Sequence, residues 1–392
     1  MENLLAALLL IWGNASAAQN DITLDKVVAA SLTPPPIVAV DENTPAGSAD
    51  DYLRPTSKED PQPDAPKVRG VYSTAYSAGG ARFQQLVKLM DETELNSLVI
   101  DIKDDKGYIT YKTGNPELEK TGAEQKFIGD ISSVMNTMKE HDIYPIARIV
   151  VFKDTILANK RPDLSFKNPD GTLWTNKNND SFVNPYMKEV WDYNIEVAKE
   201  AAKQGFKEIQ FDYVRFPEGF EKRADILKYT HDKRTRINAV SEFVKYAKEQ
   251  LTPLGVRVSV DIFGYAAAVP AAEGIGQDFQ KISQNVDVIC PMIYPSHYST
   301  GWYGSNVPDA QPYKTIDGAS IDTEKKLAPL KELKPIVRPW IQDFTATWVS
   351  GHIKYGKAQV DAQIKALKDN GVDEFLLWSS SNKYTPGVDY TP

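Results

Sequence analysis

The chain has 392 residues, a single cysteine and a formal net charge of -8 at pH 7. The length leaves room for one (β/α)8 barrel of roughly 250 residues together with additional segments. The negative charge argues against nucleic acid or an anionic membrane as the main partner, and one cysteine excludes both an internal disulfide and a zinc site built from cysteines.

The first 18 residues have the pattern of an export signal. An apolar run at residues 4–12 is too short to span a bilayer comfortably, and the small residues at 14–18 are typical of a signal-peptidase site. Glu2 stands where a basic residue is expected. We therefore predict a cleaved signal-like segment at residues 1–18 and a mature protein that is secreted or associated with the cell envelope, without membrane contact.

Residues 19–66 are rich in proline, aspartate, alanine and serine, with almost no aromatic side chains. Such a segment cannot bury enough apolar surface to offset the entropy lost on ordering. We predict a disordered, acidic, proline-rich linker at residues 19–66.

From residue 67 onward, short apolar segments alternate with amphipathic helical segments. Strands are predicted at residues 68–74, 97–103, 144–154, 207–212, 255–264, 286–294, 335–343 and 373–380. Helices are predicted at residues 81–95, 127–141, 185–205, 238–249 and 359–370, and long loops at residues 155–184 and after residue 294. This alternation predicts an α/β protein with a (β/α)8 TIM barrel at residues 67–392, an open doubly wound sheet being the alternative.

Cofactor motifs are missing from the sequence. No G-x-G-x-x-G follows an early strand and there is no P-loop, so nucleotide binding has no support. The four histidines are scattered without metal-ligand spacing. We predict neither a cofactor nor a metal site.

Two aspartates stand at the ends of neighbouring predicted strands. In residues 209–212 apolar and polar side chains alternate, which places Asp212 inside the barrel at the C-terminal end of its strand. The same alternation in residues 256–261 places Asp261 at a matching height on the next strand. Two carboxyl groups that flank a sugar linkage can cleave it, because one donates a proton while the other attacks or activates water. Asp212 and Asp261 are therefore the predicted catalytic pair.

The roles within this pair follow from the expected surroundings. Asp212 is assigned as nucleophile or base, kept ionised by Arg215 or another interior cation, and Asp261 as proton donor. Glu218 and Asp343 are alternative proton donors. The competing interpretation is a non-catalytic barrel that binds carbohydrate or cell wall. Its interior carboxylates would pair with interior arginines, namely Arg148, Arg257 and Arg338.

Aromatic residues at predicted strand ends form a second pattern, because flat rings can stack on sugar rings. These residues are Tyr72, Trp174, Tyr294, Tyr298, Trp302, Trp340 and Trp378. The full set predicted to hold substrate is Asp101, Lys103, Arg148, Trp174, Arg215, Tyr294, Trp302, Trp340, Asp343 and Trp378. The predicted partner is thus a polysaccharide or oligosaccharide, bound by a monomer.

Several segments together resemble a known family. VRGVYST, LVIDIKDDKG, IQFDYVRFP, VSVDIFGY and FLLWSSSN, in this order, are similar to the bacterial glycosyl hydrolase domain that is distantly related to α-amylase-type barrels. The resemblance extends from residue 67 to the C-terminus and implies a TIM barrel acting on carbohydrate, with Asp212 as the equivalent of the amylase nucleophile. Amylases carry a glutamic acid on strand five, where this chain has Asp261, and a His-Asp pair on strand seven, where it has Gln342 and Asp343. The proton donor, the linkage and the stereochemical outcome therefore stay open.

Overall fold

The computed structural model describes residues 60–391. The predicted signal-like segment at residues 1–18 and most of the predicted linker lie outside these residues, so export stays a prediction. Within the described range, no helix combines the length and the apolar character needed to cross a membrane.

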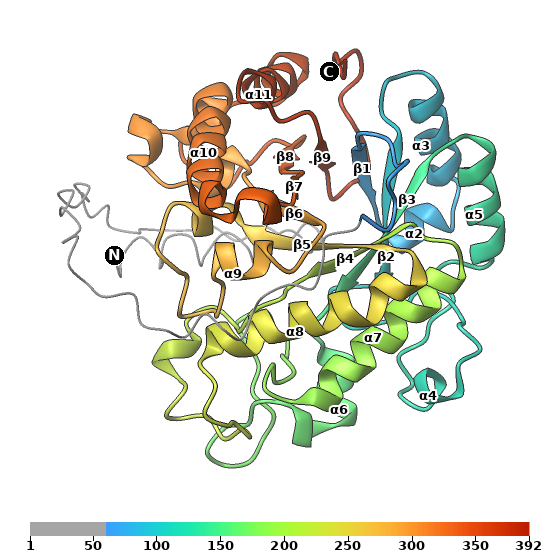
Figure 1. The fold of residues 1–392 in the computed structure, drawn as a ribbon, viewed down its shortest axis with the longest axis vertical. Coiled ribbons are helices and arrows are strands. Elements are labelled where there is room, and N and C mark those ends of the chain that lie inside the picture. The colour runs from blue at the N-terminus through green and yellow to red at the C-terminus, as the bar shows by residue number, and fades with distance from the viewer. Residues whose placement is uncertain (1–59, 392) are drawn as a thin grey trace.

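The strands form a closed parallel barrel surrounded by helices (Figure 1). They are β1 Arg69–Ser73, β2 Ser97–Lys103, β3 Tyr144–Val150, β4 Glu208–Asp212, β5 Arg257–Phe263, β6 Val288–Met292, β7 Ile336–Val337, β8 Trp340–Gln342 and β9 Phe375–Trp378. β5 pairs with β6 and β9 pairs with β1, which closes the sheet. β7 and β8 both pair with β6 and together form one stave, that is, one position in the ring of strands. This stave is divided at Pro339, which has no N–H to donate. The fold is a (β/α)8 TIM barrel, as the sequence predicts.

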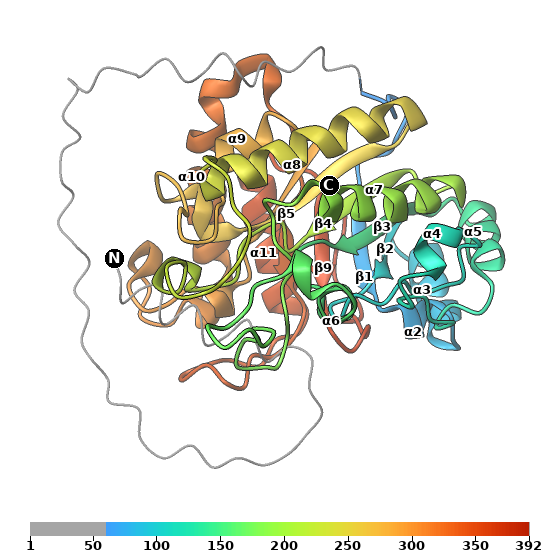
Figure 2. The same cartoon turned by 90° about the horizontal axis from the view of Figure 1, so that it is seen from below.

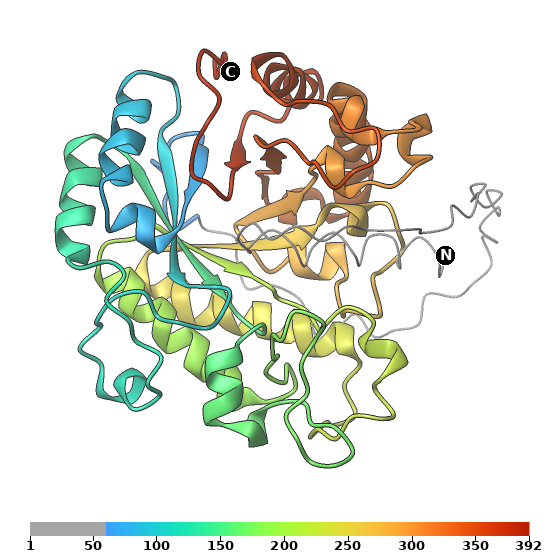
Figure 3. The ribbon, with the colours of Figure 1, turned by 180° about the vertical axis from the view of Figure 1, so that it is seen from behind.

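The helices lie on the outside of the barrel. They are α2 Ala75–Ala78, α3 Arg82–Asp91, α4 Pro116–Glu119, α5 Ile131–Glu140, α6 Thr155–Lys160, α7 Lys188–Lys203, α8 Arg236–Leu251, α9 Phe279–Ser283, α10 Pro312–Leu327 and α11 Lys357–Asp369. The predicted helices correspond to α3, α5, α7, α8 and α11. Figure 2 shows α7 and α8 side by side, and Figure 3 shows α10 beside α11.

Helix α10 lies in a segment predicted as loop, and the reason is its composition. It begins at Pro312 and contains Gly318, and small or polar residues such as Thr315 and Ser320 make up much of its buried face. The glycine is required by packing, because a Cβ at position 318 would lie 2.2 Å from the ring of Tyr303. A helix without an apolar stripe gives no periodic signal in the sequence.

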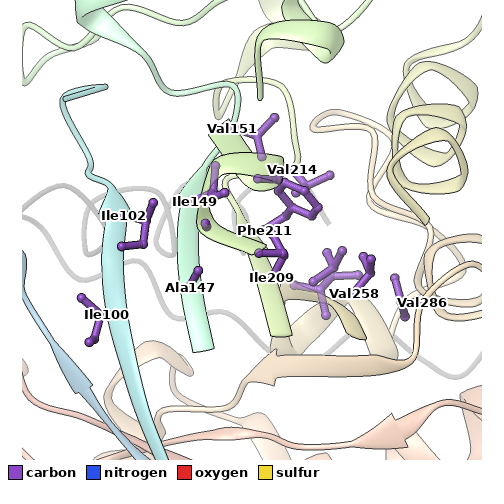
Figure 4. Close-up of a cluster of buried hydrophobic side chains, with 14 of the residues drawn as sticks. Ile100, Ile102, Ala147, Ile149, Val151, Ile209, Phe211, Val214, Val258 and Val286 are labelled. Carbon is purple, nitrogen blue, oxygen red and sulfur yellow. The ribbon is translucent and has the colours of Figure 1, made fainter. Parts of the chain in front are cut away.

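The main hydrophobic core lies between the strands and the helices (Figure 4). Outward-facing side chains of the strands, including Ile149, Ile209 and Phe211, are fully buried there. The ring of Phe211 meets Phe243 of α8 edge to face, with ring centroids 5.5 Å apart. The alternation of side chains along each strand sends these residues outward and their polar neighbours into the barrel.

Buried ion pairs fill the N-terminal end of the barrel interior. Arg338 Nη1 lies 2.7 Å from Glu208 Oε1, and Arg338 Nε lies 2.7 Å from Glu374 Oε2. Arg257 Nε donates to Asp60 Oδ1 at 2.9 Å. The ion pairs of Arg257 and Arg338 therefore lie at the end of the barrel where the strands begin, away from Asp212 and Asp261.

The end of the predicted linker differs from expectation. Arg257 Nη2 donates to the carbonyl of Gln62 at 3.0 Å, and Ala65 packs against interior side chains of the barrel. Residues 60–66 thus make defined contacts with the N-terminal end of the barrel and are not a free linker.

Replacing Arg338 tests whether this ion-pair group supports the barrel. In Arg338→Met the carboxylate of Glu208 stays buried without its partner, and breaking a buried pair on one side typically costs about 3–5 kcal/mol. We expect urea denaturation to show a loss of that size, and the double variant Arg338→Met/Glu208→Gln to recover part of it. A single variant as stable as the wild type would show that the ion pair does not support the fold.

Candidate active site

A cavity of about 580 Å³ opens at the C-terminal ends of the strands, within the roughly 300–1,000 Å³ of typical ligand pockets. Staves β2 to β5 and their loops supply its charged residues: Asp101, Asp104, Asp105, Lys106, Arg148, Lys153, Asp212 and Asp261. Staves β6, β8, β9 and β1 and their loops supply most of its aromatic rings: Tyr72, Tyr76, Tyr294, Trp340, Phe344, Trp348 and Trp378. Because the staves of each set are neighbours in the closed sheet, the cavity has a charged side and an aromatic side.

The two predicted catalytic aspartates meet in this cavity. Phe211 of β4 pairs with Val260 of β5, so the next residues, Asp212 and Asp261, stand side by side on adjacent staves. Both line the cavity, and both are almost fully buried. The alternation of side chains that predicts this placement is therefore confirmed in the structure.

Both carboxylate oxygens of Asp212 are held. Oδ2 accepts hydrogen bonds from Arg148 Nη2 at 2.6 Å and Arg148 Nε at 3.1 Å, and Oδ1 accepts one from the backbone N–H of Tyr213 at 2.6 Å. Tyr213 has a φ of 52°, a left-handed conformation that costs a non-glycine residue of order 1–3 kcal/mol. The guanidinium stabilises the charged form of Asp212. The cation beside Asp212 is thus Arg148 and not Arg215.

Asp261 has different surroundings. It is 2% exposed, and its Oδ1 accepts a hydrogen bond from Trp340 Nε1 at 2.8 Å. Burial, and then the negative charge of Asp212, raise the pKa of Asp261 well above its usual range. Asp261 therefore keeps its proton where an ordinary carboxyl group is ionised, as a general acid requires.

Asp101 is the third buried carboxyl group of the cavity. Its Oδ1 accepts from Arg148 Nη1 at 2.7 Å, and its Oδ2 accepts from the hydroxyl of Tyr72 at 2.5 Å. Burial raises the pKa of Asp101 to about 7, against the opposing effect of Arg148. Arg148 therefore bridges Asp101 and Asp212 across the charged side.

Asp105 extends the charged side toward the mouth of the cavity. Arg148 Nη2 lies 3.4 Å from its carboxylate and Lys153 Nζ lies 3.9 Å from it. Burial opposes ionisation, but Arg148 and Lys153 together hold the pKa of Asp105 below its usual value. Asp105 is not among the predicted site residues, because it lies beyond the end of its strand, in a loop.

That loop is fixed by a tight turn. Asp104 Oδ1 accepts the backbone N–H groups of Lys106, Gly107 and Tyr108 at 2.9, 3.0 and 2.9 Å. Gly107 has a φ of 100°, and a Cβ there would lie 2.0 Å from Asp154 Oδ1. Only glycine fits this turn, which brings the loop down onto the barrel.

Lys103 is predicted to hold substrate, but the structure places it outside the cavity. The pairing of β2 with β3 shifts register between Asp101 and Lys103, so that Lys103 lies opposite the outward-facing Ile149. Its ammonium group pairs with Asp154 Oδ2 at 2.6 Å and donates to Asn194 Oδ1 at 3.0 Å. The bulge reverses the direction expected for the Lys103 side chain, which binds Asp154, the residue that caps α6.

Four more predicted site residues also lie away from the cavity. Arg215 pairs with Glu218, the alternative acid, at 2.6 Å, and neither side chain is among those that line the cavity. Asp343 accepts the N–H of Thr385 at 2.8 Å and faces outward. Trp174 packs against Phe182, and Trp302 packs against Tyr298 and Tyr303. These contacts belong to the outer core, the main hydrophobic core between the strands and the helices.

The aromatic side combines predicted and unpredicted residues. Tyr72 and Trp378 stack with centroids 4.1 Å apart, and Trp340 meets Trp378 edge to face at 5.6 Å. Phe344 and Trp348, in the loop after β8, were not predicted. Their only sequence signal is two aromatic residues closely following a strand end.

His297 also lines the cavity and was not singled out in the sequence. Its Nδ1 lies 2.9 Å from the hydroxyl of Ser296, and burial lowers the pKa of His297 to about 3. The imidazole is therefore neutral over the physiological range. Among residues 60–391, no group of three or more histidine, cysteine or acidic side chains is arranged to hold a metal ion.

Comparisons with known proteins agree with this architecture. The model of a family described as "Putative glycosyl hydrolase domain" matches residues 70–384. A hypothetical protein from Ruminiclostridium thermocellum ATCC 27405 is 38% identical, over 49% of this chain and 96% of that one, with a TM-score of 0.45. No match was found among curated proteins.

Two further solved structures are similar in fold. The PgaB (BpsB) glycoside hydrolase domain from Bordetella bronchiseptica is 12% identical, over 80% of this chain and 94% of that one, with a TM-score of 0.53. The α-galactosidase TtGalA from Thermus thermophilus is 11% identical, over 82% of this chain and 63% of that one, with a TM-score of 0.50. At these identities the likeness concerns the fold alone.

The protonation of Asp261 can be tested through stability. Because its pKa is raised in the folded state, the folded protein holds a proton that the unfolded chain releases above pH ~4. The stability of the wild type relative to Asp261→Asn should therefore fall by up to about 1.4 kcal/mol per pH unit as the pH rises from about 5, until the pH passes the pKa of Asp261 in the folded protein. Urea denaturation of both proteins across this range measures the difference. A constant difference would mean that Asp261 is ionised in the folded protein.

Proposed function

Because the chain belongs to the glycosyl hydrolase domain family whose model matches residues 70–384, we propose that it cleaves glycosidic bonds in a polysaccharide, with Asp212 and Asp261 as the two catalytic groups. The observation that carries this proposal is the pair itself. Two carboxyl groups stand side by side in a cavity, one held by a guanidinium and the other buried without a cation, with a raised pKa.

Asp212 acts as the nucleophile in this proposal. Arg148 stabilises its negative charge through Oδ2, while Oδ1 has only the N–H of Tyr213 and retains a free lone pair. That oxygen can attack the anomeric carbon, and the bonds to both oxygens fix its direction before substrate binds.

Asp261 acts as the proton donor. Trp340 occupies Oδ1, which leaves Oδ2 to carry the proton toward the glycosidic oxygen. After the leaving group departs, the resulting carboxylate can take a proton from water that hydrolyses the glycosyl intermediate. The same group thus serves both half-reactions.

The spacing of the staves favours retention of anomeric configuration. Neighbouring strands lie about 4.8 Å apart, and this is the separation of the two backbones at Asp212 and Asp261. Retaining glycosidases separate their carboxyl groups by about 5–5.5 Å, and inverting ones by about 6.5–9.5 Å to admit a water molecule. We propose a double displacement through Asp212.

The two sides of the cavity suit a sugar ring. A pyranose has an apolar C–H face and a rim of hydroxyl groups. The stacked rings of Tyr72 and Trp378 can receive the face. Asp101 and Asp105, on the neighbouring strand β2 and in the loop that follows it, can accept hydrogen bonds from the hydroxyl groups.

A non-catalytic carbohydrate-binding barrel is the second candidate, and the pairing of Asp212 with Arg148 favours it. In that interpretation both catalytic carboxyl groups would be neutralised by arginines. Asp261 accepts a hydrogen bond from the indole N–H of Trp340 instead of pairing with an arginine, and its pKa is raised. These two features support catalysis over binding alone.

Substitution of the two aspartates separates their roles. On a panel of purified polysaccharides, Asp212→Asn should lower kcat by at least about 10³-fold, because the nucleophile is removed. Asp261→Asn should lower it by about 10²–10⁴-fold on the polymer, but far less on an aryl glycoside, whose leaving group needs no proton. Proton NMR of the first product should show the β or α configuration of the substrate retained.

Glu218→Gln is the matched control, because it replaces a carboxylate close to Asp212 in sequence that lies outside the cavity. It should keep activity within a fewfold of the wild type. Full turnover by Asp212→Asn would eliminate the assignment, and glycan binding by a wild type that cleaves nothing on the panel would establish the binding barrel instead.

A further inference from the structure

Two exposed aromatic rings lie on the rim of the cavity. Tyr76 is 66% exposed and Trp348 is 44% exposed, and both belong to the cavity lining. Exposed aromatic rings that border a cavity, unlike ones scattered over a surface, indicate a contact with a ligand. Tyr313, another exposed aromatic residue, lies away from the cavity and bonds Asp369 through its hydroxyl group at 2.7 Å.

Tyr76 is held rigidly. It belongs to α2, directly after β1, and its ring packs on Phe127 with centroids 4.4 Å apart. Phe127 in turn meets Tyr108 edge to face at 5.8 Å. Helix α2 is pressed against this segment, since a Cβ on Gly79 would lie 2.3 Å from the carbonyl oxygen of Phe127. A ring fixed in this way loses little entropy when a ligand stacks on it.

Trp348 continues the aromatic side of the cavity outward. Its ring stacks on Phe344 with centroids 5.9 Å apart and an interplanar angle of 21°. Phe344 meets Tyr294, at the cavity wall, edge to face at 6.0 Å. Ring contacts thus run without interruption from the interior of the cavity to the exposed indole.

The cations on the charged side of the cavity are each paired with carboxylates. Lys106 lies 2.6 Å from Asp180, and Lys153 lies 3.5 Å from the same carboxylate. Arg148 is matched by Asp101 and Asp212. With each of these cations paired, none is left for the carboxylate of an acidic sugar, while the carboxyl groups can accept hydrogen bonds from hydroxyl groups.

We propose that Tyr76 and Trp348 each bind a sugar ring outside the cavity, so that the ligand is a chain of uncharged sugars longer than the cavity itself. The cleavage of that chain rests on the proposed function, whereas its binding does not. The rim rings add affinity only for units beyond those that the cavity encloses.

Calorimetric titration of the full chain tests this proposal. The Asp212→Asn background prevents turnover, and the probes are oligosaccharides of two to six units from the cellulose, xylan, chitin and amylose series. Glucosamine and galacturonate oligomers are the charged comparators. Affinity for one uncharged series should rise with length. Trp348→Ala and Tyr76→Ala should each weaken binding of the six-unit probe about tenfold, equivalent to roughly 1.4 kcal/mol, and leave the two-unit probe unchanged.

Tyr313→Ala is the control, since it removes an aromatic ring of comparable exposure, 37%, away from the cavity. Three results would overturn the proposal: affinity that does not depend on length, tighter binding of a charged series, or no binding of any uncharged series. Cleavage by the wild type combined with length-independent binding would overturn only the sugar-binding role of Tyr76 and Trp348. Length-dependent binding without cleavage would support that role and contradict the proposed hydrolase activity.

Discussion

The candidate site depends on one buried arginine. The guanidinium of Arg148 contacts the carboxylates of Asp101, Asp105 and Asp212 at 2.7, 3.4 and 2.6 Å. Without it, three carboxyl groups at one end of a barrel would repel each other, and burial would protonate them. With it, the carboxylate of Asp212 has a cationic partner. Asp261 has Trp340 as its partner instead, and burial together with the negative charge of Asp212 raises the pKa of Asp261. The two neighbouring carboxyl groups thus have different surroundings, one beside a cation and one without.

The barrel supplies the geometry for this difference. Asp101 pairs in register with Arg148, whereas Asp212 pairs with Val150, two residues further along β3. The long side chain of Arg148 reaches both carboxylates. A second polar group, around Arg338, fills the opposite end of the interior. Apolar side chains such as Ile146 and Leu376 lie among the interior residues of the barrel. The cavity therefore opens toward the ends of the strands only, where the loops carry the remaining residues of the site.

Local patterns in the sequence predict much of this arrangement. Alternation along a strand is a property of a few consecutive residues, and it correctly placed Asp212, Asp261 and Trp340 in the interior. It failed at Lys103, because a β-bulge shifts the strand pairing there and no residue type in the sequence predicts that bulge. The sequence names Arg148 among several possible partners of the interior carboxylates but does not select it as the partner of Asp212. Arg148 lies 64 positions away in the chain and becomes a neighbour only through the pairing of β3 with β4.

Loops were the least predictable part of the site. Phe344 and Trp348 follow a strand end, but only the folded loop turns Phe344 toward Tyr294 and Trp348 onto Phe344. The opposite case is Trp302, where an aromatic residue in a long loop packs into the outer core. Composition alone cannot separate these two outcomes, because both kinds of loop contain the same residue types.

We propose that Asp212 attacks the sugar while Asp261 protonates the leaving group. Mass spectrometry of the protein after incubation with a 2-deoxy-2-fluoro glycoside of its substrate tests this directly, because the fluorine slows the second half-reaction and lets a covalent intermediate accumulate. We expect one glycosyl group per chain, located after proteolysis on Asp212. A label on Asp101 or Asp261, or rapid turnover with inverted product and no label, would contradict it.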